Sequence, residues 1–182
     1  MKSVVTIASF AAALALGGPA AAQLARNSDA PVDITADELE VAQNQCVSIW
    51  RGNAEAMQAD ARLRANVLKA TFATRSGAQR SAGATSGCGD LVRMEAEGSV
   101  YYVTPQQRVR GDQATYDAAN ETIVMTGDVV AVQGQNVVRG TRMVFNLKTG
   151  EGRMLGGATG RNAPNRPRGV FYPSKKTEPA PQ

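Results

Sequence analysis

The sequence predicts an all-β fold built from stacked strand repeats. An eight-residue pattern recurs four times along the chain, and its last apolar places alternate with polar ones as in half-buried strands. No window combines a sustained helical period with helix start and stop signals. The 182 residues are 43% apolar and 20% charged, which are globular values and suit one domain with tails.

The first 22 residues have the pattern of a signal peptide. Lys2 precedes an apolar run at residues 4–16, which is shorter than the ~20 residues of a membrane helix, and alanines follow at 20–22. An uncleaved membrane anchor is the alternative. We therefore expect an exported mature chain from Gln23, with a flexible segment over residues 23–31 and the repeats over residues 32–156.

The first half of each repeat is the eight-residue pattern. Its copies lie at residues 34–41, 63–70, 109–116 and 138–145. Copies one and two are 29 residues apart, as are copies three and four, but 46 residues separate copies two and three because 17 have been inserted. The Ser/Gly/Ala-rich stretch at about 75–89 is predicted to be the inserted loop.

The apolar places change phase within each copy. An apolar residue comes first, Ala or Gly is third, Asp, Asn or Thr is fourth, and apolar residues return at places six and eight. The first place is out of phase with the last two, so we expect a bulge or bend at the third residue that wraps the sheet around a core. These third residues are Ala36, Ala65, Gly111 and Gly140.

The second half of each repeat aligns on a glycine. Residues 47–57, 93–103 and 122–132 share a glycine at position 52, 98 or 127, and a truncated copy ends at Gly156. Turns are predicted at residues 117–120 and 148–150. The Ala-rich run from 53 to 68 has helix propensity, but the repeat alignment favours a strand. The units then stack as antiparallel hairpins about 4.8 Å apart.

The two cysteines, Cys46 and Cys88, are expected to form a disulfide. Exported proteins commonly oxidise such pairs, and the repeat alignment puts both on adjacent strands. Closing this loop would stabilise the fold by roughly 4 kcal/mol. A redox-active pair is the alternative, but the Cys-x-x-Cys spacing is missing.

The composition excludes most catalytic chemistry. The chain has no His, which excludes Ser-His-Asp and Cys-His catalysis and the commonest zinc sites. Acidic pairs such as Asp37 and Glu38 lie in the repeated strands, which favours a structural role. We therefore expect no enzymatic activity, no cofactor and no metal.

The C-terminal end is basic and rich in proline. From residue 153 onward, six Lys or Arg residues stand against Glu178 alone. Residues 157–182 are predicted to be a disordered tail, either solvated or in contact with an anionic lipid surface. Nucleic acid is not expected as a partner because an aromatic stacking surface is missing.

The repeat resembles the OstA-like family over about residues 32–155. The resemblance begins at residues 31–40, and its most typical part reads Arg110-Gly111-Asp112-Gln113-Ala114-Thr115-Tyr116, Gly127-Asp128-Val129 and Arg139-Gly140-Thr141-Arg142-Met143. The inserted loop and the two cysteines depart from the family pattern.

The resemblance implies an open β-jellyroll that holds the acyl chains of lipid A. It also implies a periplasmic protein that assembles head to tail and carries lipopolysaccharide from an inner-membrane export complex to an outer-membrane translocon. A structural or adhesive envelope repeat protein without lipid cargo is the alternative. The inward residues expected to contact lipid, or otherwise to fill an ordinary core, are Leu39, Val41, Trp50, Leu68, Met94, Val100, Tyr102, Ala114, Tyr116, Met125, Val129, Met143 and Phe145.

Two surface features complete the expectations. Arg64, Arg110 and Arg139 are predicted to form a column that binds lipid A phosphates or, as a solvated ladder, pairs with Asp37 and Asp112. The first strand, around residues 32–41, and the last, around 142–155, have no partner in the array, and the Pro/Gly-rich tail is not expected to cover the last one. Such edges invite strand addition by another copy or by a jellyroll partner.

Overall fold

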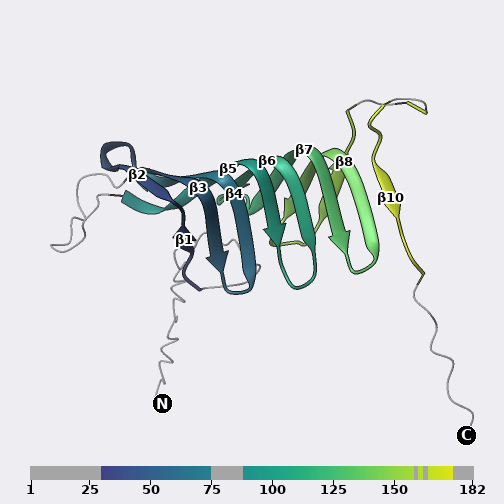
Figure 1. Cartoon of the computed structure of the whole chain (residues 1–182), viewed down its shortest axis with the longest axis horizontal. Helices are drawn as coiled ribbons and strands as arrows, with labels where there is room; N and C mark the ends of the chain where they lie inside the picture. The colour runs from purple at the N-terminus through teal and green to yellow at the C-terminus, as the bar shows by residue number, and fades with distance from the viewer. Residues whose placement is uncertain (1–29, 75–87, 158–159, 162–163, 174–182) are drawn as a thin grey trace, which may run out of the picture.

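A single antiparallel sheet contains every strand in the described part of the chain (Figure 1). The computed structural model describes residues 30–74, 88–157, 160–161 and 164–173. The strands are β1 Asp33–Thr35, β2 Glu38–Ala42, β3 Val47–Gln58, β4 Ala61–Thr74, β5 Cys88–Val103, β6 Arg108–Asp117, β7 Thr122–Gln133, β8 Asn136–Asn146, β9 Gly152–Leu155 and β10 Arg168–Val170. One 3-10 turn, η1 Gln43–Gln45, joins β2 to β3. The predicted all-β class is confirmed.

The sheet folds over into two layers and forms an open β-jellyroll (Figure 1). The strand order is β1-β3-β4-β5-β6-β7-β8-β10, while β2 and β9 pair with the other halves of β3 and β8. We call the layer that contains β1 and β10 layer 1, and the layer that contains β2 and β9 layer 2. Strands β3 to β8 cross from one layer to the other.

The four repeat copies lie in register across the sheet. Their first residues share one row of strand partners, which runs Ile34, Ala56, Leu63, Tyr102, Val109, Ala131, Val138 and Gly169. Their sixth residues share a row in layer 2, which runs Leu39, Trp50, Leu68, Ala96, Ala114, Met125, Met143 and Met154. Directly opposite residues project from the same face of a sheet, so each row brings equivalent side chains together. The stacked-repeat prediction is confirmed.

The strands cross between the layers at a ladder of β-bulges. In β3, β5 and β7, two residues lie opposite a single residue of the next strand, at positions 52–53, 98–99 and 127–128. Each bulge begins at a glycine with positive φ, which is 77° at Gly52 and Gly98 and 102° at Gly127. This conformation is one that glycine adopts at little steric cost.

The location of the bulges corrects the expectation from the repeat. The phase change is present, but the extra residue lies at these glycines and not at Ala36, Ala65, Gly111 or Gly140. The fourth repeat residues explain why: a Cβ atom at Gly52, Gly98 or Gly127 would collide with the side chains of Asp37, Asn66 and Asp112, respectively. The central glycine of one half-repeat and the short polar residue of the other therefore require each other.

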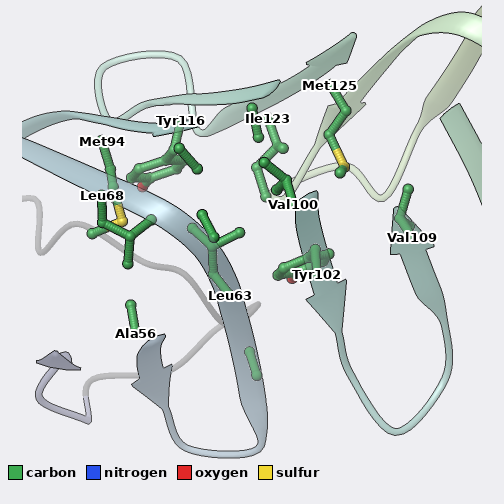
Figure 2. Packing of buried hydrophobic residues seen from close by; sticks show 14 of the residues in the cluster. Ala56, Leu63, Leu68, Met94, Val100, Tyr102, Val109, Tyr116, Ile123 and Met125 are labelled. Carbon is green, nitrogen blue, oxygen red and sulfur yellow. The ribbon is translucent and has the colours of Figure 1, made fainter. Parts of the chain in front are cut away.

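Small and medium apolar side chains from both layers fill the core (Figure 2). In β4 the buried residues are Ala61, Leu63 and Ala65 in layer 1 and Leu68 and Ala70 in layer 2, because the alternation changes phase opposite the bulge of β3. A cavity among these core side chains, beside Leu63 and Met125, has a volume of about 10 Å³, room for about one water molecule. The Ala-rich run at 53–68 falls in β3, β4 and the turn between them, which confirms the strand prediction.

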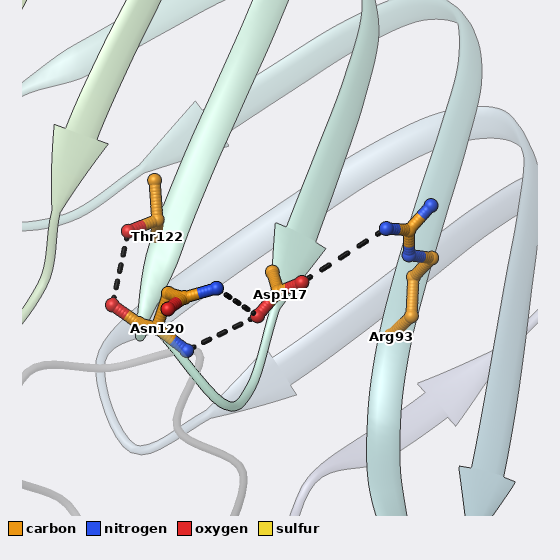
Figure 3. A network of polar contacts seen from close by, with 4 residues as sticks. All are labelled: Arg93, Asp117, Asn120 and Thr122. Carbon is orange, nitrogen blue, oxygen red and sulfur yellow. Dashed lines mark hydrogen bonds and ion pairs between the residues drawn. The ribbon is translucent and has the colours of Figure 1, made fainter.

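The turn between β6 and β7 is held by its own polar side chains (Figure 3). Oδ1 of Asp117 accepts hydrogen bonds from the backbone N–H and the side-chain amide of Asn120 at 3.1 and 3.0 Å. The hydroxyl of Thr122 donates to the Asn120 carbonyl at 2.9 Å, and Arg93 on β5 lies 3.9 Å from Oδ2 of Asp117. A local side-chain turn of this kind explains why residues 117–120 were predictable from sequence.

The two cysteines form the expected disulfide. Cys46 follows η1, Cys88 begins β5, and their Cα atoms are 5.5 Å apart. The bond therefore joins the start of the β3–β4 hairpin to the start of β5 in layer 2. It anchors Cys88, the first described residue after positions 75–87, to the start of that hairpin.

Replacing both cysteines by serine should lower the free energy of unfolding by roughly 4 kcal/mol, because the disulfide closes a long loop in the unfolded chain. Urea unfolding of the wild type, of the reduced wild type and of the Cys46→Ser/Cys88→Ser variant measures this loss. Peptide mapping of the non-reduced protein should show the two cysteine peptides linked. Two free thiols in protein purified without a reductant would contradict the bond.

The C-terminal segment differs from its prediction. β10 pairs with Val137, Val138 and Arg139 of β8, so residues 157–182 are not wholly a disordered tail and part of the last long strand is covered. A three-residue strand can add at an edge because only one of its sides has to be paired. The expected signal peptide, residues 23–29 and the loop at 75–87 lie outside the described residues; positions 88–89 of that loop belong to β5.

Candidate functional site

A cleft opens where the free ends of the two layers face each other. Layer 1 contributes the turns after β3 and β5 and the end of β7, and layer 2 contributes the end of β8 and the turn that follows it. The cleft has a volume of about 560 Å³, within the usual range of ligand pockets. We call it the seam cleft, and it is lined by Asp60, Ala61, Tyr102, Thr104, Gln106, Gln107, Gln133, Phe145, Leu147 and Gly150.

The seam cleft is apolar at its base and polar at its rim. Tyr102 and Leu147 are buried at the base, and both belong to the hydrophobic core cluster. Gln106 and Gln133 at the rim are exposed. A ligand with apolar chains and a polar end would match this gradient, because apolar surface gains free energy when it leaves water and the polar end stays solvated.

Among the described side chains of the cleft, Tyr102 has a phenol whose pKa is raised. It is only 2% exposed. Burial, followed by the charge of Asp60, raises the pKa of its phenol from 10.0 to about 12. The phenol therefore stays neutral at physiological pH and presents a hydroxyl group, not a charge, to the cleft.

Tyr102 should make the fold sensitive to alkali. The folded state holds the phenolic proton more tightly than the unfolded state, so this contribution is intact below pH 10.0 and is lost as the pH rises through about 12. The full loss is roughly 2 to 3 kcal/mol. Melting temperatures between about pH 8 and 11.5 should fall more steeply for the wild type than for Tyr102→Phe. Parallel curves for the two proteins would refute this role.

The residues predicted to face inward occupy four places in the structure. Those buried in the core are Leu68, Met94, Val100, Ala114, Tyr116, Met125, Val129 and Met143 (Figure 2). Tyr102 and Phe145 line the seam cleft, and Trp50 packs partly buried against the core. Leu39 and Val41 belong to the inner-face rows but are 48% and 55% exposed on β2. Contact of any of these residues with lipid stays a prediction.

Several residues of the cleft were missed by the sequence reasoning. Gln106, Gln107 and Gln133 lie in or beside turns, outside the repeated positions. Leu147 follows β8 directly and is buried although no repeat place marks it. Its apolar character just before the predicted turn at 148–150 was the only available signal.

The arginine column exists, but its partners differ from those expected. Arg64, Arg110 and Arg139 share an outer row of layer 1. Arg64 lies 3.5 Å from a carboxylate oxygen of Glu55, and Arg110 lies 2.8 Å from Asp128. The expected acceptors, Asp37 and Asp112, sit instead against the bulge glycines, where Asp37 accepts a hydrogen bond from Asn53. The arginines therefore pair with a residue of the neighbouring strand or of a bulge, and not with the aspartates of the eight-residue pattern.

The two edges of the sheet carry opposite charge. The N-terminal edge, β1 and β2 with the link between them, carries Asp33, Asp37, Glu38 and Glu40. The C-terminal edge is formed by β9 and β10, which both cover β8, and not by residues 142–155 as one strand. Its basic residues on β8, β9 and β10 are Arg139, Arg142, Arg153 and Arg168. Within the described residues the outward sides of β1, β2, β9 and β10 have no strand partner.

The described residues offer no sign of a metal centre or of a membrane-spanning helix. No group of three or more Cys, Asp or Glu side chains in this part of the chain is arranged to hold a metal ion. No helix in it is long and apolar enough to cross a bilayer. The seam cleft and the two sheet edges remain as the functional candidates.

An open jellyroll with an apolar-based cleft at its seam and an exposed strand edge at each end has the form of a carrier protein. A family model confirms this class. The model described as LptA/(LptD N-terminal domain) LPS transport protein matches residues 33–151, and the chain belongs to this lipopolysaccharide-transport family.

Two other proteins are similar to this chain. An uncharacterized protein of Rhizobium meliloti (strain 1021) is 28% identical over 129 residues, which cover 70% of this chain and 67% of that protein. The crystal structure of LptH, the LptA-homologous periplasmic component of the lipopolysaccharide transport device of Pseudomonas aeruginosa, aligns with a TM-score of 0.64. The two sequences are 16% identical, and the alignment covers 81% of this chain and 99% of the LptH chain. The likeness supports the jellyroll fold.

Proposed function

We propose that this protein binds lipopolysaccharide in the periplasm and passes it from an inner-membrane export complex toward an outer-membrane translocon, without catalysing a reaction. Family membership supports the cargo class. The seam cleft is the structural observation that carries the proposal, because it combines an apolar base with an open polar rim.

The acyl chains of lipid A would enter at the seam cleft. The cleft offers about 560 Å³, whereas the cavity beside Leu63 and Met125 in the core is about 10 Å³. Tyr102 and Phe145 would therefore meet lipid first. Core residues such as Leu68 and Met125 would contact it only where the two layers separate, since both are fully buried.

Copies of the protein would assemble through their sheet edges. β1 is antiparallel to β3 and β10 is antiparallel to β8, so strand alternation continues if β10 of one copy meets β1 of the next. The same holds for β9 and β2 in layer 2. The contact joins two different surfaces, which gives an open chain and not a closed dimer. Jellyroll partners at either membrane would use the same edges.

The rows of strand partners specify a register for this contact. Continuing each layer 2 row by one strand puts Glu40 of one copy opposite Arg153 of the next on the outer face. On the inner face it puts Leu39 opposite Met154. The first pair has opposite charges and the second is apolar. This register would cover the exposed Leu39 side chain and match the acidic edge with the basic one.

Site-specific photocrosslinking in cells tests the cargo. A photoreactive residue at Gln106 or Gln133 on the cleft rim should crosslink to lipopolysaccharide, and one at the exposed Gln113, on the outer face of layer 2, should not. The proposal fails if the rim positions give no more product than Gln113 does.

The packed interior favours one other function, a structural envelope repeat protein without lipid cargo. Its own side chains already fill the space between the layers, as in an ordinary sandwich core. Co-purification separates the two functions: the carrier should retain lipopolysaccharide through gentle purification, and a purely structural protein should not.

A further inference from the structure

A second hollow lies on the outer face of layer 1, directly across one turn from the seam cleft. It has a volume of about 750 Å³, and its walls include Arg62, Arg64, Arg108, Tyr101, Val103 and Val132. We propose that this outer hollow binds the phosphorylated sugar of a lipid whose acyl chains occupy the seam cleft. This inference rests on the proposed function and deepens it by placing the head group.

The hollow contains more guanidinium groups than carboxylates that could pair with them. Glu55 serves both Arg62 and Arg64, with N–O distances of 2.6 and 3.5 Å. Arg108 forms no ion pair with any described residue, and the carboxylate of Asp60 lies at the end of the hollow that is shared with the seam cleft. A phosphate group would accept hydrogen bonds from the guanidinium group of Arg108. A planar guanidinium group can donate to two phosphate oxygens at once and so matches phosphate geometry better than an ammonium group does.

The floor of the hollow is apolar and aromatic. Tyr101 is 46% exposed on the outer face of β5, and on the next outer row Val103 and Val132 lie on either side of Arg108. An exposed aromatic ring beside arginines provides an amphipathic surface for a sugar ring that carries a charged substituent. The combination fits a phosphorylated saccharide better than inorganic phosphate, which would leave the ring unused.

The β5–β6 turn lies between the two hollows. Its residues Thr104, Gln106 and Gln107 line both of them, as does Asp60 of the β3–β4 turn. A lipid with its chains inside the seam cleft can therefore cross the β5–β6 turn and place its head group outside. Lys69, whose side chain is 45% exposed, lies on the outer face of layer 2 and lines neither hollow.

Binding of matched lipids to the full mature chain tests the site. The probes are bisphosphorylated lipid A, the same lipid A with both phosphates removed, the acyl-free bisphosphorylated disaccharide, and inorganic phosphate. The variants are Arg62→Gln/Arg108→Gln and, as a control in charge and exposure, Lys69→Gln. Circular dichroism and thermal unfolding verify that every variant is folded.

We expect the double variant to bind bisphosphorylated lipid A about tenfold more weakly, as the loss of charged hydrogen bonds predicts. Its affinity for dephosphorylated lipid A should not change, and Lys69→Gln should resemble the wild type. Equal losses for both lipids, or no loss at all, would overturn the site. Inorganic phosphate that competes as well as the disaccharide would reduce it to a simple anion site and overturn the saccharide assignment. If the wild type binds the disaccharide through these arginines but no lipid A, the carrier function fails while this site stands.

Discussion

Met125→Asp should abolish stable folding. Met125 is fully buried in the row that crosses all of layer 2, and its neighbours Ala114 and Met143 are apolar. A carboxylate there would be desolvated without a partner, at a cost of several kcal/mol, which approaches the whole stability of a small domain. Urea unfolding followed by circular dichroism should show no cooperative transition, or a midpoint shifted far below that of the wild type.

The matched control is Val124, the residue that precedes Met125 in β7. Val124→Asp introduces the same carboxylate on the outer face, where Val124 is only partly buried opposite Thr115 and Val144. It should cost at most about 1 kcal/mol. A Met125→Asp protein that folds and binds lipopolysaccharide normally would contradict the assignment of this row to the interior. Loss of lipid binding must therefore be tested at the cleft rim, where substitutions spare the core.

Cysteines placed at the two edges should link copies of the protein into a ladder. With Leu39→Cys and Met154→Cys in one chain, oxidation should give disulfide-linked dimers, trimers and longer species. The proposed register puts these residues opposite each other on the inner face, and directly opposite Cβ atoms lie about 4.5–5.5 Å apart, close to disulfide distance. The described native cysteines are already paired and do not compete.

The control for register uses the neighbouring residue. Leu39→Cys with Arg153→Cys changes the partner by one position and to the opposite face, so it should crosslink much less. Efficient products from this control would show assembly in another register. Analytical ultracentrifugation across a concentration series gives the independent measurement. A wild-type protein that stays monomeric, gives no crosslinks and binds no jellyroll partner would contradict the bridge mechanism.

The sequence predicts those features that depend on local periodicity. The 29-residue spacing placed Ile34 and Leu63 on one row, and the alternation at places six and eight identified Met143 as buried. Both follow from the two-residue period of a strand, which any eight-residue segment can display. The disulfide was predictable because the chain contains only one possible pair.

Features that depend on the meeting of distant turns were not predictable. Gln106 and Leu147 line the same cleft although 41 positions separate them and neither occupies a repeat place. The extra residue of each bulge could be assigned to either strand until the clash at Gly127 showed which one carries it. β10 escaped notice because three residues are too few for a periodic signal.

The uninterrupted rows also determine length. Eight strand positions lie side by side in layer 1, and neighbouring strands are about 4.8 Å apart, so one copy spans roughly 38 Å of sheet. Copies that continued the rows would extend an assembly in whole steps of this size, and a given gap between membranes would select an integral number of them. Duplication of one hairpin would lengthen each step by roughly 10 Å while every core row stayed in register. The length of the sheet and the residues that fill its core can therefore vary independently in this fold. Evolution could change the length without altering the core.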